Sequence, residues 1–509
     1  MSTDVSTSFA ARLSALRVAG PVVVPHVIDG QELTVGDLIL REDPSNPGSA
    51  ASGCHDAPTE LVHRAVQSSR AAQRDWARVP VAQRAEHVRR AIPYVESMLE
   101  DWTARVALEV GKTEALSRAE VLETLEFLRL YSQYVLEPGA MEEQHGVHRS
   151  EIRSTSSLRP YGVFGIISPF NYPTPLTGGP AIAAVLAGNG VVIKGSHLTP
   201  WSAHAVYEMF EVMDLPRGLV NIIHGADEPG KALVASDVDG IGFVGSAEVG
   251  SIILRQMASG PYFRPVIAEL GGKNPTIVTD TADLDLAADG IVFSAFDLTG
   301  QKCSALSRVL VTPLVHDELV AKVTERAAGL KFSDPAEGDS FAGPLISQSA
   351  VRRYLEKVED ARRGGFSVAG GAAPKEGTYF PEAVVVSGIP HTHALAREEH
   401  FLPFLTISGV ESLDEALFVC NDVSLGLTAG IYTGVRADAE LFLETIQAGN
   451  VNVNIPGNAT TLWWPGSDTF GGWKGSGTTG KQGYGKWYVQ QFAREQGRKV
   501  PVDLADLLD

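Results

Sequence analysis

Cys303 is the residue whose type and surroundings most directly offer chemistry. It lies in residues 299–305 (TGQKCSA), after an expected helix and in a glycine-containing turn that would display its side chain to a cleft. A thiolate at such a place is a nucleophile for a carbonyl carbon. A lone cysteine is more often a small buried hydrophobic residue, and the local sequence does not decide between the two roles.

Two further side chains would complete a site for carbonyl chemistry. Glu269 stands between an apolar segment and the Gly-Gly turn at 271–272, where burial would raise its pKa and make it a general base. The alternative is a solvated or ion-paired surface glutamate. Asn171 lies between two prolines that stiffen the chain, so its amide could donate to an oxyanion. An asparagine beside proline is also a common turn residue.

Phosphate and ribose binding is indicated at two places. Residues 243–250 (FVGSAEVG) follow an expected strand and open an expected helix, so backbone N–H groups and the Ser246 hydroxyl would suit a pyrophosphate. The usual GxGxxG pattern is absent, which makes this signal weak alone. Lys194, after the apolar run GVVI, could bind ribose hydroxyls, although a lysine that ends a strand is usually just exposed.

Alternating strands and helices are expected to position these residues. Residues 58–134 have helical periodicity. From residue 160 onward, helical segments such as 202–213 separate the apolar runs YGVFGIIS, GNGVVIKG, GLVNIIHG and GIGFVG. A second series follows Glu269, with expected helices at 284–298 and 316–330 and expected strands in PTIVT, SRVLVT, YFPEAVVVS, LTISGV and GNVNVN. This alternation predicts two consecutive α/β domains with parallel sheets, and the glycine-rich stretch 466–485 reads as a long functional loop.

The bulk composition excludes several classes of protein. A chain of 509 residues with a formal charge of −19 is long enough for two or three domains and would repel phosphate backbones, which argues against nucleic-acid binding. The sequence has neither a secretory leader nor a run of 18 apolar residues, so we expect no membrane span and a cytoplasmic location. Cys54, in a turn-rich polar stretch, and Cys420, at the end of an apolar helical segment, are expected to be structural. The histidines show no metal-ligand spacing, so no catalytic metal is expected.

Taken together, these segments resemble the aldehyde dehydrogenase superfamily over residues 26–488. The resemblance rests on Pro-x-Asn-x-Pro at 169–173, the strand-end lysine, the Gly-Ser-x-x-x-Gly turn, ELGGKNP at 269–275, GQKC at 300–303, EEHFLP at 398–403 and FGGWKGSG at 470–477, all in family order. It implies that Cys303 attacks an aldehyde, that Asn171 and the Cys303 N–H hold the oxyanion, and that Glu269 activates the water that hydrolyses a thioester.

The resemblance also implies a layout and a set of binding residues. A cofactor domain would span 1–137 and 161–270, a catalytic domain 271–470, and oligomerisation segments 138–160 and 486–500, giving two Rossmann-like domains and a small β arm in a homodimer or homotetramer. The implied cofactor residues are Ile167, Ser168, Pro169, Phe170, Lys194, Ser196, His197, Gly225, Gly245, Ser246, Leu270, Gly271, Glu399 and Phe401. The substrate-pocket candidates are Tyr172, Leu298, Lys302, Ser304, Leu462, Trp463 and Phe470.

Departures from the family pattern bear on specificity. Many NAD-selective relatives have a glutamate where this chain has His197, so both NAD and NADP are expected to be compatible, with a slight preference for NAD. Pro180, in place of a frequent lysine, and the run around Cys303 resemble the glutamate-semialdehyde (1-pyrroline-5-carboxylate) dehydrogenase branch. That branch anchors a substrate carboxylate with small residues, whereas the corresponding positions here are near Leu462 and Trp463. An apolar or aromatic aldehyde is therefore expected.

Three alternatives remain open. The substrate could be glutamate semialdehyde, as in that branch. A CoA-acylating enzyme is disfavoured by the presence of Glu269, which acylating relatives usually lack. A family member kept for a structural or binding role is disfavoured because Cys303, Glu269 and Asn171 are all present.

Overall fold

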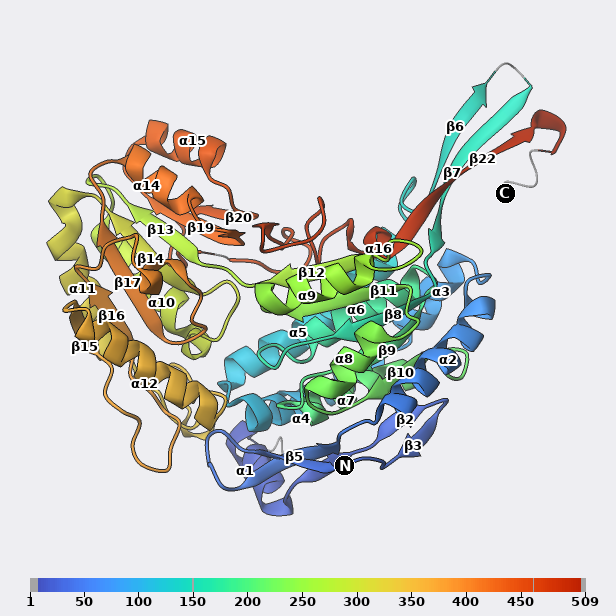
Figure 1. Ribbon diagram of the computed structural model, residues 1–509, viewed down its shortest axis with the longest axis horizontal. Helices are drawn as coiled ribbons and strands as arrows, with labels where there is room; N and C mark the ends of the chain where they lie inside the picture. The colour runs from blue at the N-terminus through green and yellow to red at the C-terminus, as the bar shows by residue number, and fades with distance from the viewer. Residues whose placement is uncertain (1–7, 149–150, 461, 505–509) are drawn as a thin grey trace, which may run out of the picture.

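The computed structural model describes residues 8–148, 151–460 and 462–504, which form two seven-stranded sheets and a projecting β arm (Figure 1). The expected fold class, α/β with two mainly parallel sheets and a small β arm, is confirmed. Within the described ranges, no helix is long and apolar enough to cross a membrane.

The first sheet has the strand order β12-β11-β8-β9-β10-β2-β3. Its central strands are parallel, because helices cross over between them, while β2 and β3 run antiparallel at one edge. The strands are β2 (His26–Ile28), β3 (Gln31–Leu33), β8 (Val163–Ile167), β9 (Gly190–Lys194), β10 (Val220–Ile223), β11 (Gly240–Gly245) and β12 (Val266–Leu270). Val191, Val192 and Ile193 of β9 are fully buried, as expected for a strand covered on both faces.

Helices cover this sheet and account for the expected helical region at 58–134. They are α2 (Thr59–Trp76), α3 (Val81–Arg89), α4 (Ile92–Val110), α5 (Glu114–Tyr134), α6 (Pro175–Leu186), α7 (Pro200–Glu211), α8 (Asp227–Ala235) and α9 (Ala247–Ala258). The N-terminal region adds α1 (Phe9–Ala19) and a small sheet of β1 (Val22–Val24), β5 (Ala50–His55) and β4 (Leu38–Glu42). Cys54 lies in β5 and is fully buried, so its expected turn-rich setting is wrong.

The second sheet has the order β15-β16-β17-β14-β13-β19-β20, with β15 antiparallel at one edge. Its strands are β13 (Asn274–Val278), β14 (Leu306–Val311), β15 (Ser367–Gly370), β16 (Val384–Ser387), β17 (Phe404–Gly409), β19 (Thr428–Tyr432) and β20 (Asn450–Val453). Its helices are α10 (Leu284–Phe296), η1 (Asp297–Gly300), η2 (Pro313–Val315), α11 (His316–Ala328), η3 (Pro335–Glu337), α12 (Gln348–Arg363), α13 (Ala394–Arg397), α14 (Leu413–Asn421) and α15 (Arg436–Thr445).

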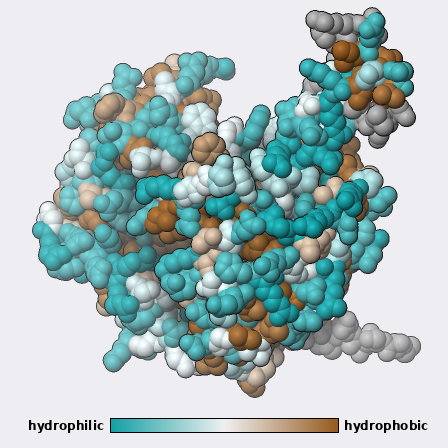
Figure 2. Space-filling model, turned by 45° about the vertical axis from the view of Figure 1, so that its right-hand side comes forward, coloured by the Kyte–Doolittle hydropathy of each residue, from teal (hydrophilic) through white to brown (hydrophobic). Residues whose placement is uncertain are grey.

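The arm consists of β6 (Glu142–His148), β7 (Ile152–Pro160) and β22 (Ala493–Pro501), paired in the order β22-β7-β6. Nine residue pairs join β22 to β7 in antiparallel register, so the end of the chain closes a hairpin formed far earlier in the sequence. Figure 2 shows that the arm stands clear of the body. The glycine-rich stretch is mostly loop, with β21 (Trp473–Lys474) paired to β18 (Leu425–Gly426), and the short helix α16 (Tyr488–Gln491) leads into β22.

Candidate active site

Cys303 lies on the loop between α10 and β14, and an unusual backbone brings it there. The expected helix 284–298 ends earlier, at Phe296, and the next turn reverses the chain. Leu298, Thr299 and Gly300 all adopt left-handed backbone conformations, with φ of 50°, 57° and 67°. Such a run is costly for residues with a Cβ and persists only where surrounding contacts impose it.

Hydrogen bonds from distant segments hold this loop. Asn274, the first residue of β13, donates through Nδ2 to the carbonyls of Cys303 (2.8 Å) and Ala305 (2.9 Å). The Gln301 amide oxygen accepts from the N–H of Ile346 (2.9 Å), and Thr299 Oγ1 donates to the Gly343 carbonyl (2.7 Å). The position of the thiol is therefore set by the packed second sheet and not by the loop alone.

The Asn171 and Glu269 side chains converge on the same place from the first sheet. Asn171 is buried after β8, and its Nδ2 donates to the Gln301 carbonyl at 3.1 Å, two residues before Cys303. Glu269 lies on β12 and is 8% exposed, and its Oε2 has no hydrogen-bond partner among the residues described. Burial raises the pKa of Glu269 well above its usual value, against the opposing hydrogen bond from the Gly472 N–H.

One cleft of about 300 Å³ joins these groups to the expected cofactor residues. It is lined by Pro169, Phe170, Asn171, Leu176, Val244, Gly245, Ser246, Glu269, Gly271, Cys303, Arg353, Glu399, His400 and Phe401. Burial raises the pKa of the Cys303 thiol to about 12, helped by the nearby Glu399 and Glu269 carboxyls and opposed by Lys302. The thiol therefore has to give up a proton when it attacks.

Glu399 and Phe401 form the wall of the cleft contributed by the second sheet. The N–H of Gly272 donates to Glu399 Oε1 at 3.2 Å, and burial raises the pKa of Glu399 to about 7. A side chain at Gly271 would overlap the Glu399 carboxylate, so a glycine is required there. The Phe401 ring meets Phe170 edge to face, with centroids 5.9 Å apart.

The opposite wall is formed where parallel strands of the first sheet end. The register places Ile167 beside Lys194 and Gly245 beside Leu270, so the carboxyl ends of β8, β9, β11 and β12 meet at one edge. Ligands of open α/β sheets bind at such an edge. The Ser168 N–H donates to the Lys194 carbonyl (3.3 Å), which continues the edge beyond β8.

The residues at this edge fit a dinucleotide. Ser246 caps α9, because its Oγ accepts from the Val249 N–H at 3.3 Å, which leaves its O–H and the free N–H groups of the first turn for a phosphate. A side chain at Gly245 would overlap the Phe243 ring, and one at Gly225 would overlap Asp56, so a glycine is required at both turns. Lys194, Ser196, His197 and Gly225 lie further along the same edge.

The substrate-pocket candidates fall into two groups. Lys302 donates to Asp297 Oδ2 (2.8 Å) and also bonds the Tyr172 hydroxyl, while the ammonium of Lys112 lies 3.3 Å from the centroid of the Tyr172 ring. Leu298 and Ser304 are buried close to them.

The second group is aromatic. Trp463 packs against Phe127, Phe470 and Tyr484 with ring centroids 5.7–6.1 Å apart, and Cys303 packs against the same hydrophobic cluster. Leu462 is 65% exposed. Like the other six substrate-pocket candidates, it is not among the residues that line the cleft.

Four residues line the cleft without having been singled out from the sequence: Leu176, Val244, Arg353 and His400. Val244 and His400 stand inside the two segments already marked as cofactor-binding, so their neighbours could have pointed to them. Arg353 is an exposed charge on the amphipathic helix α12 of the second sheet. No sequence pattern indicates that packing of the two sheets brings it to the cofactor edge.

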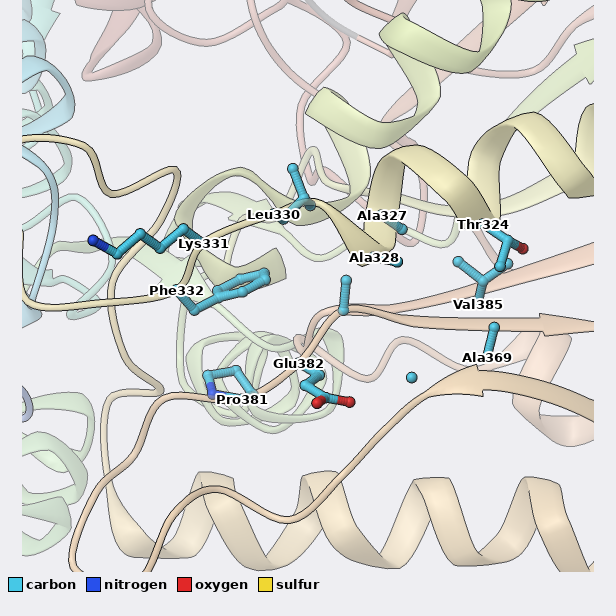
Figure 3. A pocket seen from close by; sticks show the side chains of 12 residues that line it. Thr324, Ala327, Ala328, Leu330, Lys331, Phe332, Ala369, Pro381, Glu382 and Val385 are labelled. Carbon is cyan, nitrogen blue, oxygen red and sulfur yellow. The ribbon is translucent and has the colours of Figure 1, made fainter.

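A separate cavity of about 400 Å³ lies between the end of α11 and strands β15 and β16 (Figure 3). It shares no lining residue with the cleft. Its two charged residues already have partners, because Lys331 pairs with Glu337 and Asp339, and Glu382 accepts from the Ala372 N–H. Within the part of the chain that the structure describes, no cluster of three or more metal-ligating side chains occurs.

Comparison with known proteins gives consistent results. Residues 37–496 match the model of the aldehyde dehydrogenase family. The 1-pyrroline-5-carboxylate dehydrogenases of Geobacillus kaustophilus and Bacillus pumilus are each 31% identical to this chain, covering 90% of it and 89% of each relative. The structure of 1-pyrroline-5-carboxylate dehydrogenase from Thermus with bound NAD aligns with a TM-score of 0.91, 28% identity and 98% coverage of both chains. Proline utilization A from Bdellovibrio bacteriovorus aligns with a TM-score of 0.92 and 29% identity, over 97% of this chain but 51% of that longer one.

Proposed function

Since the chain belongs to the aldehyde dehydrogenase family, and is thus an NAD(P)-dependent oxidoreductase, we propose that it oxidises an apolar or aromatic aldehyde to its acid through a thioester on Cys303. The observation that carries the proposal is the convergence of Cys303, Glu269 and Asn171, from three distant segments, on one cleft that also contains Gly245 and Glu399.

The residues have distinct roles in this proposal. The Cys303 sulfur attacks the aldehyde carbon, and the oxygen that becomes negative accepts hydrogen bonds from the Asn171 amide and the Cys303 N–H. NAD(P)⁺, when bound, supplies the hydride acceptor that allows the adduct to become a thioester. Glu269 then removes a proton from the attacking water, for which its unpartnered Oε2 and raised pKa suit it.

We also propose which residues would bind each part of the cofactor. Glu399 and Phe401 would hold the nicotinamide riboside, and Gly245 and Ser246 the pyrophosphate. Lys194 would bind the adenosine ribose, with Ile167, Ser168, Pro169, Phe170, Ser196, His197, Gly225, Leu270 and Gly271 around it and along the cleft. We keep the expected slight preference for NAD over NADP.

The assignment of segments to domains is also proposed. The cofactor domain (1–137 and 161–270), catalytic domain (271–470) and oligomerisation segments (138–160 and 486–500) correspond to the two sheets and the arm. We propose that the arm joins copies of the chain into a homodimer or homotetramer. The cytoplasmic location stays a prediction from the sequence.

The aromatic cluster supports the proposed substrate. Trp463 replaces small polar groups with an indole packed on Phe127, Phe470 and Tyr484, next to the surface that carries Cys303. Such a wall favours an apolar tail through burial. The Trp463 Nε1 donates to the Asp468 carbonyl (3.2 Å) and so is not free for a polar substrate.

One observation favours an amino-acid semialdehyde as a second candidate. The carboxyl of Glu123 on α5 is partly buried, and its pKa is raised to about 8 by desolvation and by the charge of Glu120, against the charges of Lys112 and Lys302. Lys302 is the neighbour of Cys303, so the Glu123 carboxyl would serve as a hydrogen-bond acceptor for a substrate ammonium on this side of the site. The names of the 1-pyrroline-5-carboxylate dehydrogenases that match this chain point in the same direction.

A steady-state comparison of benzaldehyde, hexanal and glutamate semialdehyde, each with NAD⁺ and NADP⁺, tests the proposal. We expect the largest kcat/KM with an apolar or aromatic aldehyde and a loss of that preference in Trp463→Ala. A strong preference for glutamate semialdehyde, lowered by Glu123→Gln but not by Trp463→Ala, would establish the second candidate instead. Added CoA should not become acylated, because Glu269 directs water to the thioester.

A further inference from the structure

The environment of Lys194 at the end of β9 differs from that of an ordinary surface lysine. Lys194 is 7% exposed, and its ammonium makes no hydrogen bond or ion pair with any residue in the described ranges. Its stem lies along the first turn of α8, because a Cβ built on Gly230 would be 3.9 Å from Lys194 Cε. The stem is buried, but Lys194 Nζ is not among the fully buried polar atoms that lack a partner, so it keeps access to solvent and can donate to a ligand that supplies an acceptor.

Two carboxylates flank this ammonium without reaching it. Asp227 is the first residue of α8, and Asp56 follows β5 and accepts from the Ala226 N–H at 2.9 Å. Burial lowers the pKa of Lys194, and the negative charges of Asp227 and Asp56 counter that effect. Because neither carboxylate is close enough to Lys194 for an ion pair, space remains between the ammonium and the carboxylates of Asp227 and Asp56.

The other basic groups nearby are placed differently from Lys194. The Arg41 guanidinium is buried and donates to the carbonyls of Leu198 (2.9 Å), Glu109 (3.3 Å) and Ile346 (2.5 Å), so it keeps its charge but is held by the backbone. Burial and the charges of Lys194 and Arg41 lower the pKa of His197. Lys194 is therefore the cation that Asp227 and Asp56 flank.

We propose that Asp227 is the residue that makes this enzyme select a dinucleotide with a free ribose diol over one with a 2′-phosphate. The inference rests on the proposed binding of the adenosine ribose at Lys194. A ribose hydroxyl both accepts from an ammonium and donates to a carboxylate, so it fits the gap between Lys194 and Asp227. A phosphate dianion only accepts and is repelled by Asp227 and Asp56. The discrimination assigned in many relatives to the position of His197 is thus exerted here from α8.

The test compares dissociation constants of NADH and NADPH, measured by nucleotide fluorescence, in the wild type, Asp227→Asn and Glu228→Gln. Glu228 is the matched control, because it is the next residue, is 76% exposed and pairs with Lys231. We expect the wild type to bind NADH more tightly. Asp227→Asn should lower the ratio of the NADPH dissociation constant to the NADH dissociation constant by about tenfold. A tenfold change corresponds to about 1.4 kcal/mol, the scale expected for removing one repulsive charge. Glu228→Gln should leave the ratio unchanged.

The salt dependence provides a second measurement. As the salt concentration rises from about 0.05 to about 0.5 M, the wild-type ratio of dissociation constants should decrease, because screening weakens the repulsion of the 2′-phosphate. The decrease should be smaller in Asp227→Asn. An unchanged ratio in Asp227→Asn, or a wild type that prefers NADPH, would overturn the inference while leaving the proposed function intact. If neither nucleotide binds, or if Lys194→Ala binds both as the wild type does, the proposed cofactor site itself is wrong and the inference falls with it.

Discussion

At the scale of single residues, the cleft contains a carboxyl and a thiol whose pKa values are both raised. Glu269 lies on β12 of the first sheet and Cys303 on the loop before β14 of the second, and burial is the largest cause of the raised pKa of each. A buried carboxylate has few partners to replace water, which makes it a stronger base than an exposed one. The reactivity of this pair therefore arises from where the fold places it, since neither side chain is unusual in its chemistry.

Glu269→Gln should separate the two halves of the proposed reaction. The amide cannot remove a proton from water, so we expect the first turnover to release reduced cofactor in a burst while steady-state kcat falls by roughly 100-fold or more. Stopped-flow absorbance of the reduced cofactor measures both. Glu411→Gln, an exposed carboxylate outside the cleft, is the control. Equal loss of burst and steady state would place Glu269 in thiol activation instead.

The pH dependence follows from the same carboxyl. Its base form is populated only above a pKa that burial has raised well above the usual value, so kcat should climb through neutral pH and not level off near pH 5. Glu269→Gln should lose this limb of the profile. A wild-type kcat that is flat from pH 5 upward would show that the carboxylate is already ionised and that its burial has no kinetic effect.

The free energy of unfolding should change with pH in the direction opposite to kcat. The folded protein binds the Glu269 proton more tightly than the unfolded chain, so the free energy of unfolding is highest below the unfolded pKa and falls as pH rises through the folded one. Glu269→Gln should therefore raise the Tm relative to wild type at pH 8 and leave it nearly equal at pH 4. Calorimetry at both values checks this, and a destabilised variant at pH 8 would contradict it.

At the scale of elements, the turn after α10 positions the nucleophile. The left-handed run at 298–300 packs against the segment after Phe401, and a methyl group on Gly300 would overlap the Leu402 carbonyl. Backbone contacts of this kind cannot be relieved by a change of rotamer. The loop therefore has one geometry, and the thiol has one position relative to Asn171.

Gly300→Ala should cost activity beyond its cost in stability. Gly457 is the matched control, since it is also left-handed (φ 65°) but has open space where a Cβ would go. Both alanine variants should lose about 1 kcal/mol of unfolding free energy from backbone strain, and Gly300→Ala should lose more because its Cβ overlaps the Leu402 carbonyl. Only Gly300→Ala should also lose kcat, by 10-fold or more, because a small displacement of a reacting group is costly. Unfolding in urea and steady-state rates measure the two effects, and equal kcat losses would remove the special role of the turn.

Strand and helix segments differ in how far the sequence alone predicts them. Apolar runs such as GVVI in β9 and VNII in β10 could be predicted, because a parallel strand buried on both faces needs no alternation. The short N-terminal strands could not, since their residues are mixed and their pairing is with segments far away. Cys54 shows the difficulty, because polar neighbours conceal a strand that is buried only through tertiary packing.

The residues of the site also differ in how far the sequence alone predicts them. Cys303, Glu269, Asn171 and Gly245 were found because their motifs are local and ordered, and the structure brings them to one cleft. Arg353 could not be found, because its position depends on how α12 of one sheet meets the other sheet. The exposed position of Leu462 was also beyond a sequence argument, since the next residue, Trp463, packs against Phe127 of the distant helix α5.

At the scale of the whole molecule, the arm joins two segments that lie far apart in the sequence. β7 leads directly into β8 of the first sheet, and β22 pairs with it only when nearly all the chain has been made. Val502 and Leu504, just beyond β22, are each 46% exposed, an apolar surface that a second copy could cover. None of the described residues of the arm lines the cleft.

Removal of the arm should therefore change assembly more than chemistry. The wild type should have a solution mass that is a multiple of 54.3 kDa by light scattering. Replacing residues 142–157 by a short turn and ending the chain at 494 should give a monomer that still binds NADH. A wild-type monomer would refute the proposed role of the arm, and an assembled variant would assign the contact to another surface.

The raised pKa of Cys303 has a consequence for the survival of the enzyme between turnovers. Peroxides and alkylating agents attack thiolates and largely spare thiols. With a pKa of about 12, nearly all of the resting enzyme at neutral pH holds sulfur in the spared form. A nucleophile kept as a thiol by burial is therefore less open to oxidative damage than an exposed thiolate would be.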